Sequence, residues 1–287
     1  MTAAKRSKSK NNLDLLRWYG EMGVEESTGE ACVDRFSPAR EPRDGDEKAV
    51  DAGVAGRKSP SPAPLFAVEE KGDDTSARIE SCRTIAELVG ILSAFDACPL
   101  KKTATNLVFC DGTPTARVMI VGEAPGRDED LQGKPFVGRS GKLLDRMLGA
   151  IGLSRHDEDP AKSVFISNCI FWRPPGNRKP SEAETLMCLP FLERGIELVD
   201  PDILVALGAT AAQRLLGTTK GIMRSRGQWS TYKTPHGKTI AAIASLHPAY
   251  LLRQPAHKRL AWQDFLKIRE ALDKTPKIDK ISGESLS

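Results

Sequence analysis

The sequence has no long hydrophobic run, and this absence excludes a helix that crosses a membrane. A transmembrane helix needs roughly 18 or more consecutive apolar residues, and no such run occurs in this chain. The first residues, MTAAKRSKSKNN, are basic and lack the apolar stretch of a secretory signal. We therefore expect a cytoplasmic protein with no membrane partner.

Cysteine is scarce as well. The six cysteines show no close, regular spacing, which is unlike the disulfide framework of a small secreted protein. Unpaired thiols and metal ligands are the two alternatives that remain.

A strong excess of one charge is also missing. The 42 Lys and Arg residues stand against 38 Asp and Glu residues, and the pI is near 8.7. Such a balance permits a nucleic-acid partner without requiring one.

Large apolar residues are sparse before residue 83. SPAREPRDGDEK and GRKSPSPAP mix charges with proline, and such segments cannot offset the entropy of ordering. We predict a largely disordered extension over residues 1–82, with a short amphipathic helix near 12–24, where NLDLLRWYGEMG has helical spacing. We predict that one domain occupies residues 83–274 and that a tail occupies residues 275–287.

Four nearly continuous apolar runs characterise this domain: RVMIVG, SVFISNCI, DILVALG and TIAAIASL. Strands that are buried on both faces have this composition. Segments with helical spacing, such as SGKLLDRMLGAIGL, lie between them. The alternation predicts an α/β fold with a parallel sheet that helices cover on both faces. Ligands bind such sheets at the carboxyl ends of the strands, so the loops after Gly122, Ile170, Gly208 and Leu246 should carry the chemistry.

The loop after the first run reads GEAPGRDEDLQGKPFVG. Gly122 and Gly126 allow the backbone to approach a ligand closely. The loop is not a phosphate-binding P-loop, because Lys142 lacks the required upstream glycine and is not followed by Ser or Thr. Phe136, between a proline and a valine, has two interpretations: a core residue or a stacking platform.

The loop after the second run reads NCIFWRPPGNRKP. Asn168 can read the edge of a base through two hydrogen bonds, or it can simply form a turn. Arg173 and Arg178 flank two prolines in a rigid, cationic loop, which suits the phosphate backbone of DNA.

The fourth run leads into SLHPAYLLRQPAHKR. His247 follows the strand at the place where catalytic residues of such sheets gather. Tyr250, Leu251, Leu252 and Arg253 form a candidate apolar wedge beside a cation, and such wedges pry a duplex open. We assign Leu251, Leu252 and Arg253, with Arg173 and Arg178, to DNA binding.

These segments, in this order, resemble the motifs of the uracil-DNA glycosylase superfamily, and most closely its family four. The resemblance covers roughly residues 88–272 and rests on GEAPG with EDLQGKPFVGRSGKLLD, on RPPGNRKPSEAE and on HPAYLLR. It implies a three-layer αβα sandwich around a central four-stranded parallel sheet. It also implies a monomeric enzyme that flips deoxyuridine out of double- or single-stranded DNA and hydrolyses its N-glycosidic bond. The alternative is a uracil-DNA-binding protein of the same fold with little or no turnover.

The resemblance assigns roles by position. Glu123, with the backbone around Ala124, would position or activate the water, and His247 would donate to uracil O2. Phe136 would stack on the flipped uracil, and Asn168 would read its edge. Ala124 stands where the first family of these enzymes has an aspartate. Glu123 and His247 are thus the implied catalytic residues, and the implied substrate-binding residues are Gly122, Ala124, Phe136 and Asn168.

Family four ordinarily binds a 4Fe-4S cluster through four cysteines, and only two of these positions are cysteine here. Cys98 and Cys188 match ligand positions, whereas Phe95 and Trp172 occupy the other two. Clusters of this type need four thiolates. We therefore expect no cofactor and no metal, with the two aromatic side chains filling the volume of the cluster.

Overall fold

The four apolar runs form the centre of one sheet in the computed structural model, which describes residues 71–274. The central strands pair in parallel, and a short antiparallel strand closes each edge in the order β1-β3-β2-β4-β6-β5. The predicted parallel sheet is confirmed, and the edge strands are additions to it. The strands are β1 (Cys110–Gly112), β2 (Val118–Gly122), β3 (Val164–Asn168), β4 (Ile203–Leu207), β5 (Trp229–Lys233) and β6 (Thr239–Ser245).

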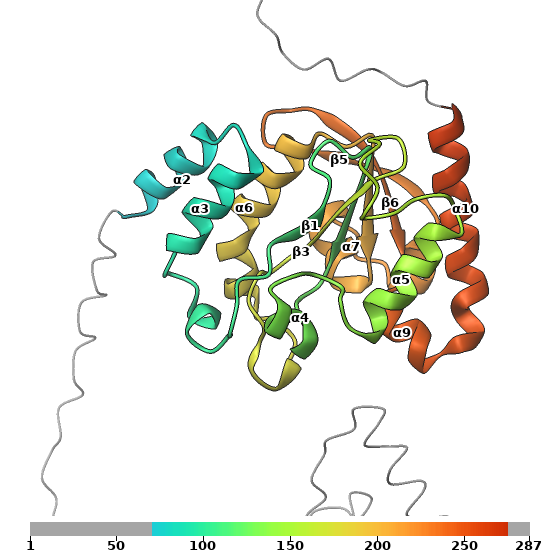
Figure 1. Cartoon of the computed structure of the whole chain (residues 1–287), viewed down its shortest axis with the longest axis horizontal. Helices are drawn as coiled ribbons and strands as arrows, with labels where there is room; N and C mark the ends of the chain where they lie inside the picture. The colour runs from blue at the N-terminus through green and yellow to red at the C-terminus, as the bar shows by residue number, and fades with distance from the viewer. Residues whose placement is uncertain (1–70, 275–287) are drawn as a thin grey trace, which may run out of the picture. The chain divides into compact units, whose positions relative to one another are not determined.

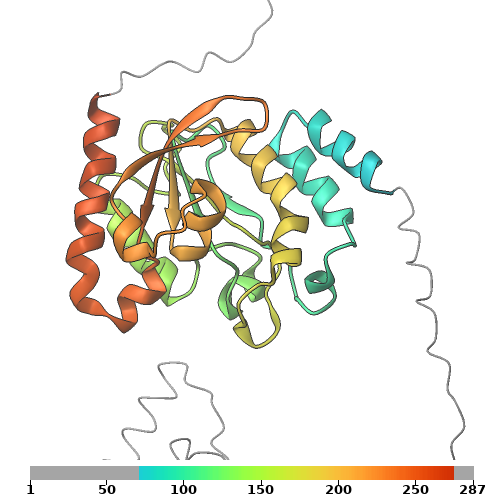
Figure 2. The same cartoon turned by 180° about the vertical axis from the view of Figure 1, so that it is seen from behind.

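Helices cover both faces of the sheet, as the two opposite views show (Figures 1 and 2). Helices α3, α6 and α7 pack on one face, and α5 and α10 pack on the other. This arrangement is the predicted three-layer αβα sandwich. The helices are α2 (Lys71–Ser81), α3 (Ile85–Ala94), α4 (Arg127–Gln132), α5 (Arg139–Gly149), α6 (Glu182–Val199), α7 (Ala209–Leu216), α8 (Ile222–Ser225), α9 (Pro248–Arg253) and α10 (Lys258–Lys274), with 3-10 turns at Pro99–Lys102, Pro175–Asn177 and Pro255–His257.

Strands β2, β3 and β4 are buried along their whole length, which explains their nearly continuous apolar sequences. In β2, Met119 and Val121 point into the core under α6, while Val118 and Ile120 point into the core under α5 and α10. Side chains of successive strand residues lie on opposite faces. A sheet that helices cover on both faces therefore favours apolar residues at nearly every position.

Helix α2 lies within residues 1–82, the segment predicted as the N-terminal extension. Its Ile79 is 5% exposed and belongs to the core beneath α3 and α6. Arg194 of α6 also donates to the carbonyl oxygen of Cys82, just beyond the helix. The described fold thus includes a helix from this segment, whereas the predicted helix near residues 12–24 and the predicted tail lie outside the described residues.

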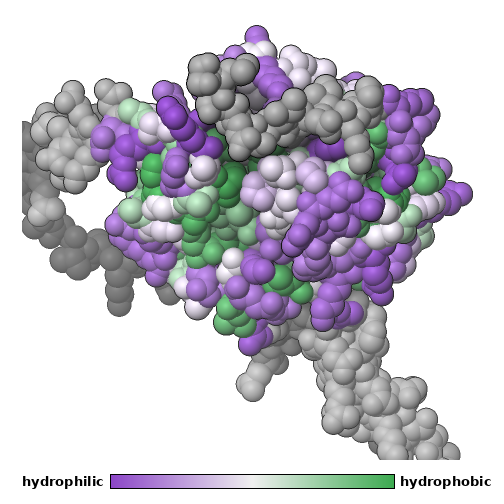
Figure 3. Space-filling model, turned by 45° about the horizontal axis from the view of Figure 1, so that its top comes forward, coloured by the Kyte–Doolittle hydropathy of each residue, from purple (hydrophilic) through white to green (hydrophobic). Residues whose placement is uncertain are grey.

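The surface carries both hydrophilic and hydrophobic residues (Figure 3). Hydrophilic residues cover much of the face seen in Figure 3, with smaller hydrophobic patches between them. Within residues 71–274, no helix is long and apolar enough to cross a membrane.

Candidate active site

A pocket of about 610 Å³ opens at the carboxyl edge of the parallel strands. Each predicted loop contributes to its lining: Glu123 and Ala124 follow β2, Asn168 ends β3, Gly208 follows β4 and His247 follows β6. This is the edge at which open α/β sheets bind ligands. The fold therefore brings the predicted catalytic residues to one cavity.

Gly122 lies beneath the pocket and does not line it. A Cβ atom built on Gly122 would lie 2.4 Å from Oδ1 of Asn168 and 2.6 Å from Cζ of Phe136. Both groups therefore pack directly against the backbone at the end of β2. Any side chain at this position would displace the amide and the ring, so the strand must end in glycine.

Asn168 lines the pocket and carries an unpaired hydrogen-bond acceptor. The residue is 1% exposed, and its Oδ1 atom has no hydrogen-bond partner in the structure. An unsatisfied buried polar group costs about 1–3 kcal/mol, so a ligand that donates to this oxygen recovers that free energy. This observation favours base reading over the turn-forming interpretation.

Phe136 forms a wall of the pocket in a strained conformation. Its φ of 54° lies in the left-handed region, which costs an L-residue roughly 1–2 kcal/mol. The ring is 4% exposed, and its centroid lies 5.4 Å from that of the His247 ring. Strain of this kind persists only where the surroundings enforce it, and it is typical of functional sites.

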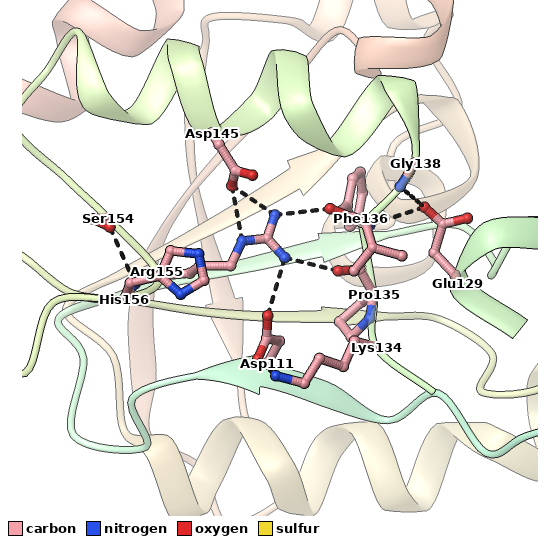
Figure 4. Close-up of polar contacts among 11 residues, drawn as sticks. Asp111, Glu129, Lys134, Pro135, Phe136, Gly138, Asp145, Ser154, Arg155 and His156 are labelled. Atoms are coloured by element: carbon pink, nitrogen blue, oxygen red, sulfur yellow. Dashed lines mark hydrogen bonds and ion pairs between the residues drawn. The ribbon is translucent and has the colours of Figure 1, made fainter. Parts of the chain in front are cut away.

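Glu129, the third acid of the first loop, holds the backbone of this segment. Its Oε1 accepts hydrogen bonds from the N–H groups of Val137 and Gly138 at 3.0 and 2.9 Å (Figure 4). Its Oε2 accepts from the N–H of Gly126 at 3.1 Å. The carboxylate is almost fully buried. Glu129 therefore joins both ends of the loop, and the sequence alone assigns it no role.

His247 is held as a neutral donor. Its Nδ1 accepts a hydrogen bond from the N–H of Ala249 at 3.2 Å, so the ring proton of the neutral form lies on Nε2. Burial, with a smaller contribution from the Arg253 charge, lowers the pKa of His247 to about 4. At neutral pH the residue can therefore offer one N–H without a positive charge.

The predicted phosphate-binding arginines have intramolecular partners. Arg173 donates from Nε to Oδ1 of Asn177 at 2.8 Å. Arg178 lines the pocket and pairs with Glu184 at 2.5 and 2.9 Å, which lowers the pKa of that carboxyl to about 2. These contacts fix the cationic loop in front of α6.

The predicted wedge needs one correction. Leu251 is fully buried, in a small apolar cluster with Leu143 and Leu246, so its side chain belongs to the core and not to a DNA-binding surface. Leu252 is half-buried and Arg253 is exposed. Neither Leu251 nor Leu252 lines the pocket, whereas Arg253 does.

Further residues outside the predicted site also line the pocket, among them Tyr250 of the predicted wedge. Tyr250 hydrogen-bonds to Nδ1 of His257 at 2.7 Å, and the two rings stack at 5.5 Å. Thr210 and Lys179 also line the pocket. Their common signal is position, because each lies within three residues of a predicted site or loop residue.

The residues at the four cluster-ligand positions do not fit a 4Fe-4S cluster. Phe95 packs edge-on against Phe191 at 5.1 Å, and Trp172 is 2% exposed within the core. Cys98 and Cys188 are both fully buried. Their thiols hydrogen-bond to each other, which lowers the pKa of Cys98. Two thiols are present where such a cluster needs four thiolates.

Among the described residues, no other cysteine belongs to a group that could complete the ligand set. Burial raises the pKa values of Cys110 and Cys169 to about 12, which favours their protonated forms. Residues 71–274 contain no group of three or more His, Cys, Asp or Glu side chains that could hold a metal ion.

Comparisons with known proteins agree with this geometry. The family model described as "Uracil DNA glycosylase superfamily" matches residues 109–266. The type-4 uracil-DNA glycosylase of Archaeoglobus fulgidus is 40% identical, over 71% of this chain and 95% of the relative. That of Thermotoga maritima is 35% identical, over 73% of this chain and 99% of the relative. That of Saccharolobus solfataricus is 41% identical, over 62% and 82%. The chain therefore belongs to the uracil-DNA glycosylase superfamily, among the type-4 uracil-DNA glycosylases.

Proposed function

We propose that this protein removes uracil from DNA by hydrolysing the N-glycosidic bond of deoxyuridine, the first step of base-excision repair. The observation that carries the proposal is the unpaired, buried Oδ1 atom of Asn168 in a pocket shared with Phe136 and His247. The substrate is uracil in double- or single-stranded DNA, and the enzyme acts as a monomer.

Asn168 provides base selection. Its amide accepts from N3–H of uracil and donates to the O4 carbonyl, while the ring of Phe136 supports the base by stacking. Cytosine has no N3–H and carries an amino group at the neighbouring carbon, so both hydrogen bonds are lost. A site built around hydrogen bonds rejects such an analogue by about 10⁴- to 10⁵-fold.

His247 and Glu123 provide the chemistry. The C1′–N1 bond breaks as negative charge gathers on uracil, and the neutral Nε2–H of His247 donates to O2. Glu123, with the backbone around Ala124, positions the water that adds to C1′, and its carboxylate stabilises the developing positive charge on the sugar. The water loses one proton on adding to C1′, the uracil anion takes up one proton, and the products are an abasic site and neutral uracil.

Exposed and half-buried groups near the pocket hold the DNA. The base must leave the helical stack, which costs a few kcal/mol. Arg173 and Arg178 contact phosphates, and Leu252 with Arg253 occupies the space that the base vacates. We leave Leu251 out of this surface because it is buried.

Single-turnover cleavage of a labelled oligonucleotide tests the function. We expect alkali-labile breaks at a single deoxyuridine placed opposite guanine, opposite adenine or unpaired, and none at cytosine or thymine. Asn168→Ala removes two hydrogen bonds and should lower the rate about 100-fold. Ser163→Ala is the matched control, because Ser163 Oγ is also buried and unpaired but lies before the opposite end of β3.

The same assay separates the two hypotheses for the fold. If the wild-type protein binds uracil-containing DNA but leaves it intact, the result supports the uracil-DNA-binding protein and contradicts the enzyme. Equal losses of the cleavage rate in Asn168→Ala and Ser163→Ala would show that Asn168 does not read the base.

We further propose that the enzyme works without an iron-sulfur cluster, because aromatic side chains fill two ligand positions. Anaerobically purified protein should contain far less than one iron and one acid-labile sulfide per chain. The Phe95→Cys/Trp172→Cys double variant, prepared in parallel, restores four cysteines and shows whether the preparation can load a cluster. About four irons per wild-type chain would overturn this proposal.

A further inference from the structure

The guanidinium of Arg155 lies behind the pocket wall, where no role has been assigned to it. The side chain is only 3% exposed and does not line the pocket. It donates from Nε to Asp145 at 2.8 Å, from Nη2 to the same carboxylate at 2.7 Å and from Nη1 to Asp111 at 3.3 Å. These two acids, from α5 and β1, fix the orientation of the planar fork (Figure 4).

The remaining donors of this fork bind the backbone on both sides of Phe136. Nη1 donates to the carbonyl oxygen of Pro135 at 2.8 Å, and Nη2 donates to that of Phe136 at 3.0 Å. Each oxygen belongs to one of the two peptide planes that meet at the Cα atom of Phe136. Holding both planes fixes φ and ψ of this residue, and thereby the direction in which its ring leaves the chain.

Glu129 holds the second of these planes from its other end. The peptide between Phe136 and Val137 donates its N–H to Oε1 of Glu129 at 3.0 Å, while its carbonyl oxygen accepts from Arg155. The peptide is thus bound between a buried anion and a buried cation. Charge-assisted hydrogen bonds of this kind are roughly twice as strong as neutral ones.

Helix α5 removes the space in which this peptide could turn. A Cβ atom built on Gly141 would lie 1.7 Å from the carbonyl oxygen of Phe136, so the helix backbone passes directly beside it. On its other side, the Phe136 ring packs over Gly122. The left-handed conformation of Phe136 is therefore enforced by polar contacts and by shape.

We infer that Arg155 is a positioning residue for uracil excision, which acts through Phe136 by holding its ring at the angle that stacks on the flipped base. This inference rests on the proposed function. Arg155 itself touches neither the base nor the DNA. Lysine cannot replace it, because a single ammonium group cannot present a planar fork to two carbonyl oxygens and two carboxylates.

A double-mutant cycle distinguishes positioning from general stabilisation. Loss of stacking in Phe136→Ala should lower kcat/KM for deoxyuridine DNA about 5- to 100-fold. Arg155→Gln and Arg155→Lys should each cause most of that loss. The Phe136→Ala/Arg155→Gln double variant should be no slower than Phe136→Ala alone, because residues that act through one contact are not additive. Affinity for undamaged DNA should not change.

Arg117→Gln is the matched control. Arg117 is also a largely buried arginine in an ion pair, 2.5 Å from Asp202, but it precedes β2 and so lies at the opposite end of the strand from Gly122. Its replacement should leave kcat/KM unchanged, and should remain without effect when it is combined with Phe136→Ala.

Additive losses for Phe136 and Arg155, or an equal loss in Arg117→Gln, would overturn the inference. If Arg155→Gln does not fold, Asp145→Asn loosens the same fork from a partly exposed position and should show a several-fold loss that is likewise absent on the Phe136→Ala background. A wild-type protein that excises no uracil contradicts the proposed function instead, so the two failures are distinguishable.

Discussion

Replacing His247 by alanine is expected to lower the single-turnover rate of uracil excision by about 10²- to 10³-fold, the usual effect of removing one fixed donor to a developing anion. The donor is fixed because Ala249 occupies Nδ1 of the ring and leaves the proton on Nε2. Affinity for undamaged DNA should stay the same. His236→Ala is the control, because His236 is exposed and pairs with Glu197 outside the pocket.

The pH dependence of the rate tests the same donor. A pKa of about 4 keeps His247 neutral as the pH falls, and the neutral tautomer is lost only as the pH passes below that value. The wild-type rate should therefore show no inflection near 6.5, where an ordinary histidine titrates. An inflection there that His247→Ala removes would show that the protonated ring is the active donor.

Replacing Trp172 by alanine should lower the free energy of unfolding by about 3–5 kcal/mol, the range for deleting a large aromatic side chain from a core. Trp172 is 2% exposed and packs near Phe171 in the main hydrophobic core. Chemical denaturation measures this loss, and the dependence of the unfolding free energy on denaturant concentration should be the same in both proteins. Trp262→Ala, at a position that is 37% exposed, should cost far less.

This prediction concerns what stabilises the fold in the region of the family's cluster. Equal losses in Trp172→Ala and Trp262→Ala would show that the tryptophan contributes little to the core. In that case the proposal that aromatic packing replaces a metal centre would lose its energetic basis.

The sheet was predictable because helices cover both faces of its central strands, which are therefore apolar at most positions. β1 has only three residues, and β5 is exposed at four of its five positions, so neither carries that pattern. Both lie at edges, where pairing with a neighbour, and not hydrophobic burial, holds a short strand in place.

The wedge shows where a sequence motif gives too little information. Leu251 and Leu252 are adjacent in the sequence, but they lie on the short helix α9. Successive helix residues point about 100° apart, so one of two neighbours turns inward when the other faces outward. Leu251 is the inward one, and the letters alone do not reveal which leucine that is.

Arg155 illustrates a different limit. It lies in the segment SRHDED between α5 and β3, where its neighbours in the sequence are unrelated to its function. Its partners come from residues 111, 135, 136 and 145. Only the tertiary fold brings two acids and two carbonyl groups around one guanidinium, so no local pattern could predict it.

The bare backbone of Gly122 has a consequence for how this pocket can change. Laboratory evolution commonly widens a binding site by trimming a side chain, but Gly122 beneath this pocket has none to trim, and any addition would strike Asn168 or Phe136. Position 122 therefore offers no route to a wider pocket, whereas Phe136 lines the pocket and can be replaced by a smaller residue. Variant libraries directed at this wall, and not at the strand, are the efficient route to new base specificity.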